Sequence, residues 1–151
     1  TDFDVILLGT SERGFGFKRE IHIWITQHDY DNANLMILLA YILLGHKEWQ
    51  GGQIKIFAIY PEEDMKHEKE RLSILIQTGR LPISPNNIQV LTQSQDKEVK
   101  SVINETSKTA DLTIMGFQAD LLKNKGKTVF EGYDGIGNTL LVHASEEKEI
   151  R

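Results

Sequence analysis

The segment from Gln27 to Asp31 carries an imidazole at His28 and carboxylates at Asp29 and Asp31. Such groups can serve as a general acid and base, or as nitrogen and oxygen ligands of a metal ion. Aspartate at the start of a helix also caps free N–H groups and favours the helix dipole. Because a long apolar run follows directly, helix capping is the simpler interpretation. An acid–base or metal enzyme remains an alternative, for which the sequence suggests no substrate.

The glycines Gly14 and Gly16 have the spacing of the opening of a dinucleotide-binding fingerprint. The third glycine of that motif would fall at Arg19, so the motif is incomplete. No capped helix follows the loop either, because Glu20 leads straight into an apolar strand. We therefore interpret these glycines as a source of flexibility and expect no cofactor here.

Zinc and hydrolase motifs are also missing from the sequence. The five histidines, at positions 22, 28, 46, 67 and 143, form no i,i+4 pair and no HExxH motif, and we expect them to be solvated or to cap helices. No serine lies in a G-x-S-x-G elbow. The sequence around each of four serines is that of an ordinary loop or helix: Ser11, Ser73, Ser94 and Ser101. The chain contains no cysteine. We predict no catalytic, cofactor-binding or metal-binding residue, and no enzyme.

The two tryptophans, Trp24 and Trp49, lie before and after the apolar run. Large aromatic side chains bury much area in a core, and an indole N–H usually finds a polar partner. We expect core packing for both. A partner interface is the functional alternative, since tryptophan is enriched at contacts.

Length and charge restrict the class of protein. A chain of 151 residues with 40% hydrophobic and 26% charged residues is typical of one globular domain. Its net charge of -5 has no basic stripe, so nucleic acid is not an expected partner. The longest apolar stretch, from Leu35 to Leu44, is shorter than the roughly 20 residues of a membrane span, so we expect no direct membrane insertion. Because the sequence begins at Thr1 without a methionine, we expect a fragment of a longer protein.

Strand patterns alternate with helix patterns along the chain, which predicts right-handed crossovers and a three-layer, mainly parallel sheet. We expect five parallel strands in the order 3-2-1-4-5 and one extra N-terminal strand. The predicted strands are Val5–Leu8, Ile21–Thr26, Gln53–Tyr60, Ile88–Leu91, Leu112–Met115 and Thr139–Val142. The predicted helices run from Asp29–Asn32 to Gly45, from Pro61 to Gly79, and from Asp96 to Thr106, with a partly helical segment after Met115.

The run Ala110–Gly116 resembles the late strand of universal stress proteins, in which a following glycine-rich stretch holds the phosphates of ATP. Here Ala119 and Asp120 stand where that family has further glycines, and their side chains prevent close approach of the backbone to a phosphate. The resemblance implies a shared fold. An independent nucleotide-binding protein of this type is the alternative function.

The segment from Glu20 to Ile59 resembles the C-terminal cytosolic domain of the cation-chloride cotransporters, the family of Na-K-Cl and K-Cl symporters. Ile21–Trp24 is similar to the family's strand I-D-V-W-W, and Asp29 corresponds to the aspartate that follows it. Leu35–Leu39 is similar to the family's next apolar helix, and Trp49 to the tryptophan near the end of that helix. Ile54–Phe57 is similar to the family's strand I-R-I-F. The family's last two strands are similar to Ala110–Met115 and Thr139–His143. Tyr30 and Asp31 replace two family glycines, and the short chain looks like a prokaryotic member.

This resemblance implies a domain that neither transports nor catalyses, and that has no cofactor. It would form a homodimer and regulate the membrane-spanning part of the same transporter, on the cytoplasmic side of the cell membrane. Residues 1–19 would be an N-terminal strand and loop that end a preceding subdomain, and residues 20–151 the α/β regulatory domain. Ions would be bound by membrane helices outside this chain.

Overall fold

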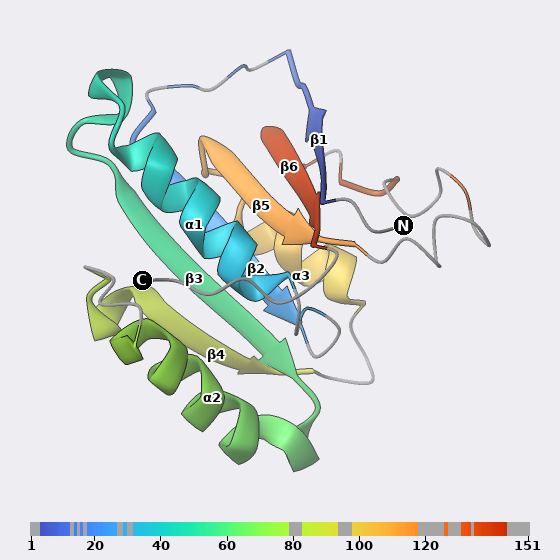
Figure 1. The fold of residues 1–151 in the computed structure, drawn as a ribbon. Helices are drawn as coiled ribbons and strands as arrows, with labels where there is room; N and C mark the ends of the chain where they lie inside the picture. Colours follow the sequence, from blue (N-terminus) through green and yellow to red (C-terminus); the bar gives the residue numbers. More distant parts are fainter. Residues whose placement is uncertain are drawn as a thin grey trace.

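The computed structural model describes residues 4–12, 14, 16, 18–26, 29, 32–78, 83–93, 98–117, 126, 131–133 and 135–144. Strands and helices alternate along them, as predicted (Figure 1). The strands are β1 (Val5–Gly9), β2 (Glu20–Thr26), β3 (Gln53–Tyr60), β4 (Ile88–Thr92), β5 (Leu112–Gly116) and β6 (Asn138–His143). The helices are α1 (Ala33–Leu44), α2 (Met65–Thr78) and α3 (Val99–Thr106), with short 3-10 turns η1 (Lys47–Trp49), η2 (Glu62–Asp64) and η3 (Pro85–Asn87).

The six strands form one mixed sheet in the order β1-β6-β5-β2-β3-β4. β1 pairs antiparallel with β6, while the other four pairings are parallel. Numbered from β2, the five parallel strands lie in the order 3-2-1-4-5, and β1 is an additional strand at the edge. The mixed α/β sheet expected from the sequence is therefore confirmed.

Helices cover both faces of the sheet (Figure 1). On one face, α1 and α2 pack on a core that includes Ile23, Ile56 and Ile114, each with no exposed surface. Each fully buried side chain of this size contributes about 1.5–3 kcal/mol. On the other face, Ile103 of α3 packs with Trp24. The central strands are apolar on both sides because both sides are covered.

The structure confirms the predicted starts and ends of α1 and the predicted strand at Gln53–Tyr60. The start of the helix predicted from Asp96 lies outside the described residues, as does most of the segment predicted to be partly helical after Met115. Trp24 and Trp49 are 1% and 5% exposed, so the prediction of core packing is confirmed for both. Within the described part of the chain, no helix is both long and apolar enough to span a bilayer.

Candidate functional sites at the two ends of the central strands

The first candidate site lies at the carboxyl ends of β2 and β5. These two strands are neighbours, and the chain proceeds from β2 to β3 on one side and from β5 to β6 on the other. Open α/β sheets bind ligands outside the strand ends at such a reversal of strand order. Asp29, three residues beyond β2, is the one predicted candidate at this point that the structure describes; Gln27, His28, Tyr30 and Asp31 lie outside the described residues.

Asp29 is buried, with 4% of its surface exposed. Its Oδ2 accepts hydrogen bonds from the backbone N–H of Thr26 at 2.8 Å and from the Thr26 hydroxyl at 3.0 Å. Its Oδ1 accepts a hydrogen bond from Nδ2 of Asn32 at 3.1 Å. The carboxylate is therefore held by the turn between β2 and α1.

Asn32 joins this turn to two further strands. Its Nδ2 also donates to the carbonyl oxygen of Phe117, just after β5, at 3.3 Å. Its Oδ1 accepts from the backbone N–H of Ala144, just after β6, at 2.8 Å. Asn32 is the N-cap residue of α1, but its side chain caps no N–H of the helix. Both ends of its amide are instead used across the sheet.

Gly116 brings β5 close to this pair of side chains. A Cβ atom at position 116 would collide with the carboxylate of Asp29 and would lie 2.7 Å from Nδ2 of Asn32. Asp29 and Asn32 thus lie directly against the backbone at the end of β5.

The glycines of the loop before β2 have backbone conformations that explain them. Gly14 and Gly16 have φ angles of +63° and +57°, which side chains rarely tolerate. A Cβ atom at Gly16 would also collide with a carboxylate oxygen of Asp111. Gly16 therefore allows the backbone to lie close to the side chain of Asp111, just before β5.

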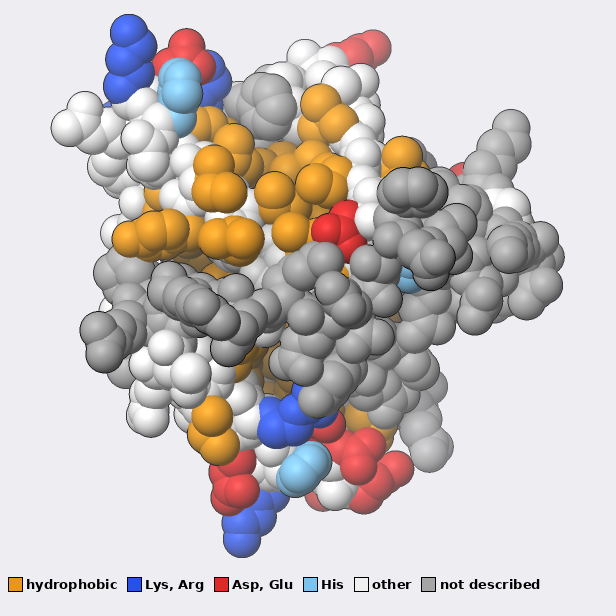
Figure 2. Space-filling model, viewed as in Figure 1, with side chains coloured by type: hydrophobic (Ala, Val, Ile, Leu, Met, Phe, Trp, Pro, Cys, Tyr) orange, Lys and Arg blue, Asp and Glu red, His pale blue; other side chains and the backbone are white. Residues whose placement is uncertain are grey.

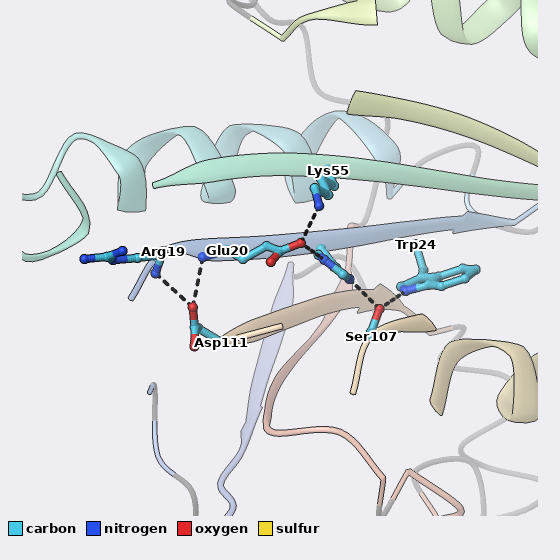
Figure 3. A network of polar contacts seen from close by, with 7 residues as sticks. Arg19, Glu20, Trp24, Lys55, Ser107 and Asp111 are labelled. Carbon is cyan, nitrogen blue, oxygen red and sulfur yellow. Dashed lines mark hydrogen bonds and ion pairs between the residues drawn. The ribbon is translucent and has the colours of Figure 1, made fainter. Parts of the chain in front are cut away.

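The second candidate site is a chain of polar contacts at the amino end of β2. Glu20, His22 and Trp24 alternate along β2 and point to the face that α3 covers. Ser107, the residue that ends α3, lies 2.7 Å from Nδ1 of His22 and 2.7 Å from Nε1 of Trp24. Figure 3 shows Ser107 beside the indole of Trp24. Glu20 lies at the other ring nitrogen of His22, Nε2.

The hydrogen atoms of this chain of contacts can be assigned from its two ends. Trp24 Nε1 can only donate, so the oxygen of Ser107 accepts. The ionised Glu20 can only accept, so Nε2 of His22, 2.7 Å from Oε1, carries a hydrogen. The remaining Nδ1 then accepts from the Ser107 hydroxyl, which requires a neutral imidazole.

The electrostatics agree with this assignment. Burial lowers the pKa of His22 below its ordinary value of 6.5, although the hydrogen bond to Glu20 acts in the opposite direction. Burial alone would raise the pKa of Glu20, but hydrogen bonds from His22 and from Lys55 outweigh it and lower that pKa. Nζ of Lys55, on β3, lies 2.8 Å from Oε1 of Glu20. Glu20 is therefore ionised and His22 neutral at neutral pH.

Asp111 closes the same end of β2. Its Oδ2 accepts from the backbone N–H groups of Arg19 at 2.9 Å and Glu20 at 3.0 Å. Its own backbone N–H donates to the carbonyl oxygen of Glu20 at 2.9 Å. Figure 3 shows the carboxylate of Asp111 with Arg19 and Glu20, beside the Glu20–Lys55 pair. The residue before β5 thus holds the start of β2.

Serine, histidine and glutamate in this order could suggest an activated nucleophile. The surface of Ser107 is 0% exposed, however, so no substrate can reach its oxygen, which also accepts from Trp24. The arrangement can orient and hold groups, but it offers no place for a substrate. Among the described residues there is also no group of three or more side chains suited to a metal ion.

This network was not predicted from the sequence. The expectation that the histidines are solvated or cap helices is wrong for His22, which is 2% exposed. His46 does cap, because its Nδ1 accepts from the backbone N–H of Glu48 at 3.2 Å. The period-two spacing of Glu20, His22 and Trp24 was the available signal, since it places all three on one face of a strand.

These features define a class of protein: a three-layer α/β domain in which buried polar side chains tie the ends of the central strands together. The family model of solute carrier family 12 matches residues 16–131, and the chain belongs to this family. No curated protein matches the sequence.

Among solved structures, the chain is similar to one described as the crystal structure of the cytoplasmic domain of a prokaryotic cation chloride cotransporter. The TM-score is 0.65 at 18% sequence identity, so the two share a fold. The similarity covers 97% of this chain and 55% of that chain. This chain therefore spans about half the length of the solved domain.

Proposed function

We propose that this chain is a cytosolic regulatory and dimerisation domain of a secondary active cation-chloride cotransporter, and that it neither transports nor catalyses by itself. The observation that carries the proposal is the family match over residues 16–131, together with a fold similar to that of a cotransporter's cytoplasmic domain. Its partners would be the membrane-spanning part of the same transporter and a second copy of itself. It would lie on the cytoplasmic side of the cell membrane.

The geometry at both ends of β2 supports a role without chemistry. A catalytic or transporting site needs polar groups that a substrate or ion can reach. Here Asp29 and Asn32 satisfy one another and the neighbouring strands, and Ser107 is sealed beneath α3. A regulatory domain instead needs a rigid core and surfaces for partners, because it acts through movement and contact.

Strand β1 supports the proposed division of the chain. It forms the edge of the sheet, and Ile6, Leu7 and Leu8 are 45%, 37% and 53% exposed. An apolar edge strand without charged side chains invites further pairing or cover. On our proposal, residues 1–19 complete a preceding subdomain of the same cytosolic region, and residues 20–151 form the regulatory domain.

The test uses the complete transporter reconstituted in liposomes, with and without the 151 residues of this domain. We expect the full protein to be a dimer by light scattering, and we expect deletion to weaken dimerisation and alter the rate of chloride-dependent cation flux. Two results would contradict the proposal. One is a gene that encodes no apolar segments of membrane length; the other is a deletion that changes neither flux nor oligomeric state.

A further inference from the structure

The described helices leave the edge strand β1 without a helix packed over it. The crossovers from β2 to β3 and from β3 to β4 place α1 and α2 on one face (Figure 1). The crossover from β4 to β5 runs the opposite way across the sheet and places α3 on the other face. On the α1 face, no described helix packs over β1, although Val142 of the neighbouring β6 is buried in the core there.

The side chains on this uncovered area are apolar. Ile6 and Leu8 pair with Val142 and Leu140, which both belong to the core on the α1 face. Opposite residues of an antiparallel pair share a face, so Ile6 and Leu8 point to this side of the sheet. They are 45% and 53% exposed. We call the area formed by Ile6, Leu8 and Leu140 the open face.

Helix α1 adds exposed apolar surface on the same side of the sheet. Tyr41 and Ile42 are 45% and 60% exposed, and none of the twelve residues of α1 is charged. Figure 2 shows hydrophobic side chains gathered over α1 and onward across the upper half of this face. Exposed apolar surface of this kind marks a place of contact.

We propose that the open face binds an amphipathic helix supplied by the remaining cytosolic part of the same polypeptide. The proposal rests on the proposed function, in which this chain is one part of a longer cytosolic region. The solved domain to which the chain is similar is matched over only 55% of its length, so such a region has substantial further chain to supply. Parallel sheets are normally covered by helices, and an apolar stripe at helical spacing fits a face without charge.

A second copy of this chain is the alternative occupant of the open face. It would offer either its own open face or the exposed Tyr41 and Ile42 of its α1. Cysteine labelling separates this alternative from a helix of the same polypeptide.

Cysteine labelling of the complete protein tests the proposal. The 151 residues contain no cysteine, so Leu8→Cys introduces a single thiol on the open face. Ile74→Cys is the matched control, because Ile74 lies on α2 with 62% of its surface exposed. The labelling rate with a maleimide is compared between native and urea-unfolded protein, and the labelled peptide is identified by mass spectrometry. We expect Leu8→Cys to be protected at least about tenfold and Ile74→Cys to be nearly unprotected, since a docked helix must open before the thiol reacts.

Ile6→Cys provides a second reading of the open face in case Leu8→Cys does not fold. Equal labelling of the open face and Ile74→Cys would overturn the inference, and the proposed function would stand if the protein still carries membrane segments. Protection lost on dilution would assign the face to a second copy. Protection found in liposomes but absent in detergent would assign it to lipid. Each of these last two results also refutes a docked helix of the same polypeptide.

Discussion

Replacing Ser107 with alanine removes one oxygen on which two buried groups depend. The N–H of Trp24 loses its acceptor, and Nδ1 of His22 loses its donor. Both side chains are almost fully buried, at 1% and 2% exposure, so water cannot take the place of the hydroxyl without a rearrangement. The expected result is a marked loss of stability without a change of fold.

The size of the loss follows from the number of groups left without partners. Each buried polar group without a hydrogen bond costs about 1–3 kcal/mol, and partial relaxation reduces the sum, so we expect Ser107→Ala to lower the free energy of unfolding by about 2–4 kcal/mol. That is a large share of the roughly 5–15 kcal/mol that a domain possesses. For a domain of this length the melting temperature should fall by roughly 5–15 °C.

Urea unfolding followed by circular dichroism measures this loss, provided that the m-value is unchanged. Ser73→Ala is the matched control, because Ser73 is exposed on α2 and its replacement should change stability by less than about 0.5 kcal/mol. In a double-mutant cycle with Trp24→Phe, the combined loss should be smaller than the sum of the single losses. If Ser107→Ala were as stable as Ser73→Ala, the proposed hydrogen-bond chain would not hold the domain together.

Three further predictions concern the same two ends of the strands. Gly116→Ala should cost about 1–3 kcal/mol in urea unfolding, because its methyl group overlaps the carboxylate of Asp29; wild-type stability would contradict this. Stability should fall as the pH is lowered below 6.5, since burial lowers the pKa of His22 and the unfolded chain therefore binds the proton more readily. It should fall further below 4.5, because the pKa of Glu20 is lowered in the folded chain and the unfolded chain again binds the proton more readily. In His22→Gln, the first part of this pH dependence should disappear, which a urea series at several pH values measures. Calorimetric titration with ATP or AMP should give no saturable heat, because Ala119 and Asp120 stand where universal stress proteins have further glycines; a micromolar dissociation constant would refute that reasoning.

The strands and helices could be predicted because their signals are local. Apolar runs separated by glycine, proline and capping residues mark each element, and the alternation of strands with helices indicates a mainly parallel sheet. The core residues could be predicted in the same way. Ile23 and Ile56 are buried because central strands are covered on both faces, and Trp24 packs against Phe57 with ring centroids 4.8 Å apart.

The contacts at the strand ends could not be predicted because they join residues far apart in sequence. Ser107 lies 85 residues from His22 and reaches it only after α3 has docked on the sheet. The role of Asn32 depends on Ala144, 112 residues away. A capping residue and a bridging residue look alike in sequence, since both use a short polar side chain before a helix.

The two sets of contacts lie at the two ends of the boundary between β2 and β5, which we call the seam. β2 and β5 are paired over four residues, Ile21–Trp24 with Leu112–Met115, and here the two halves of the parallel sheet meet. Asp111 ties the amino end of this seam, while Asn32 ties its carboxyl end to the residues after β5 and β6. Opening the seam would therefore expose several buried polar groups at once, at a cost of about 1–3 kcal/mol each. We expect the two halves to move as one body. A signal passing through this domain would then travel as a rigid movement of its surfaces against their partners.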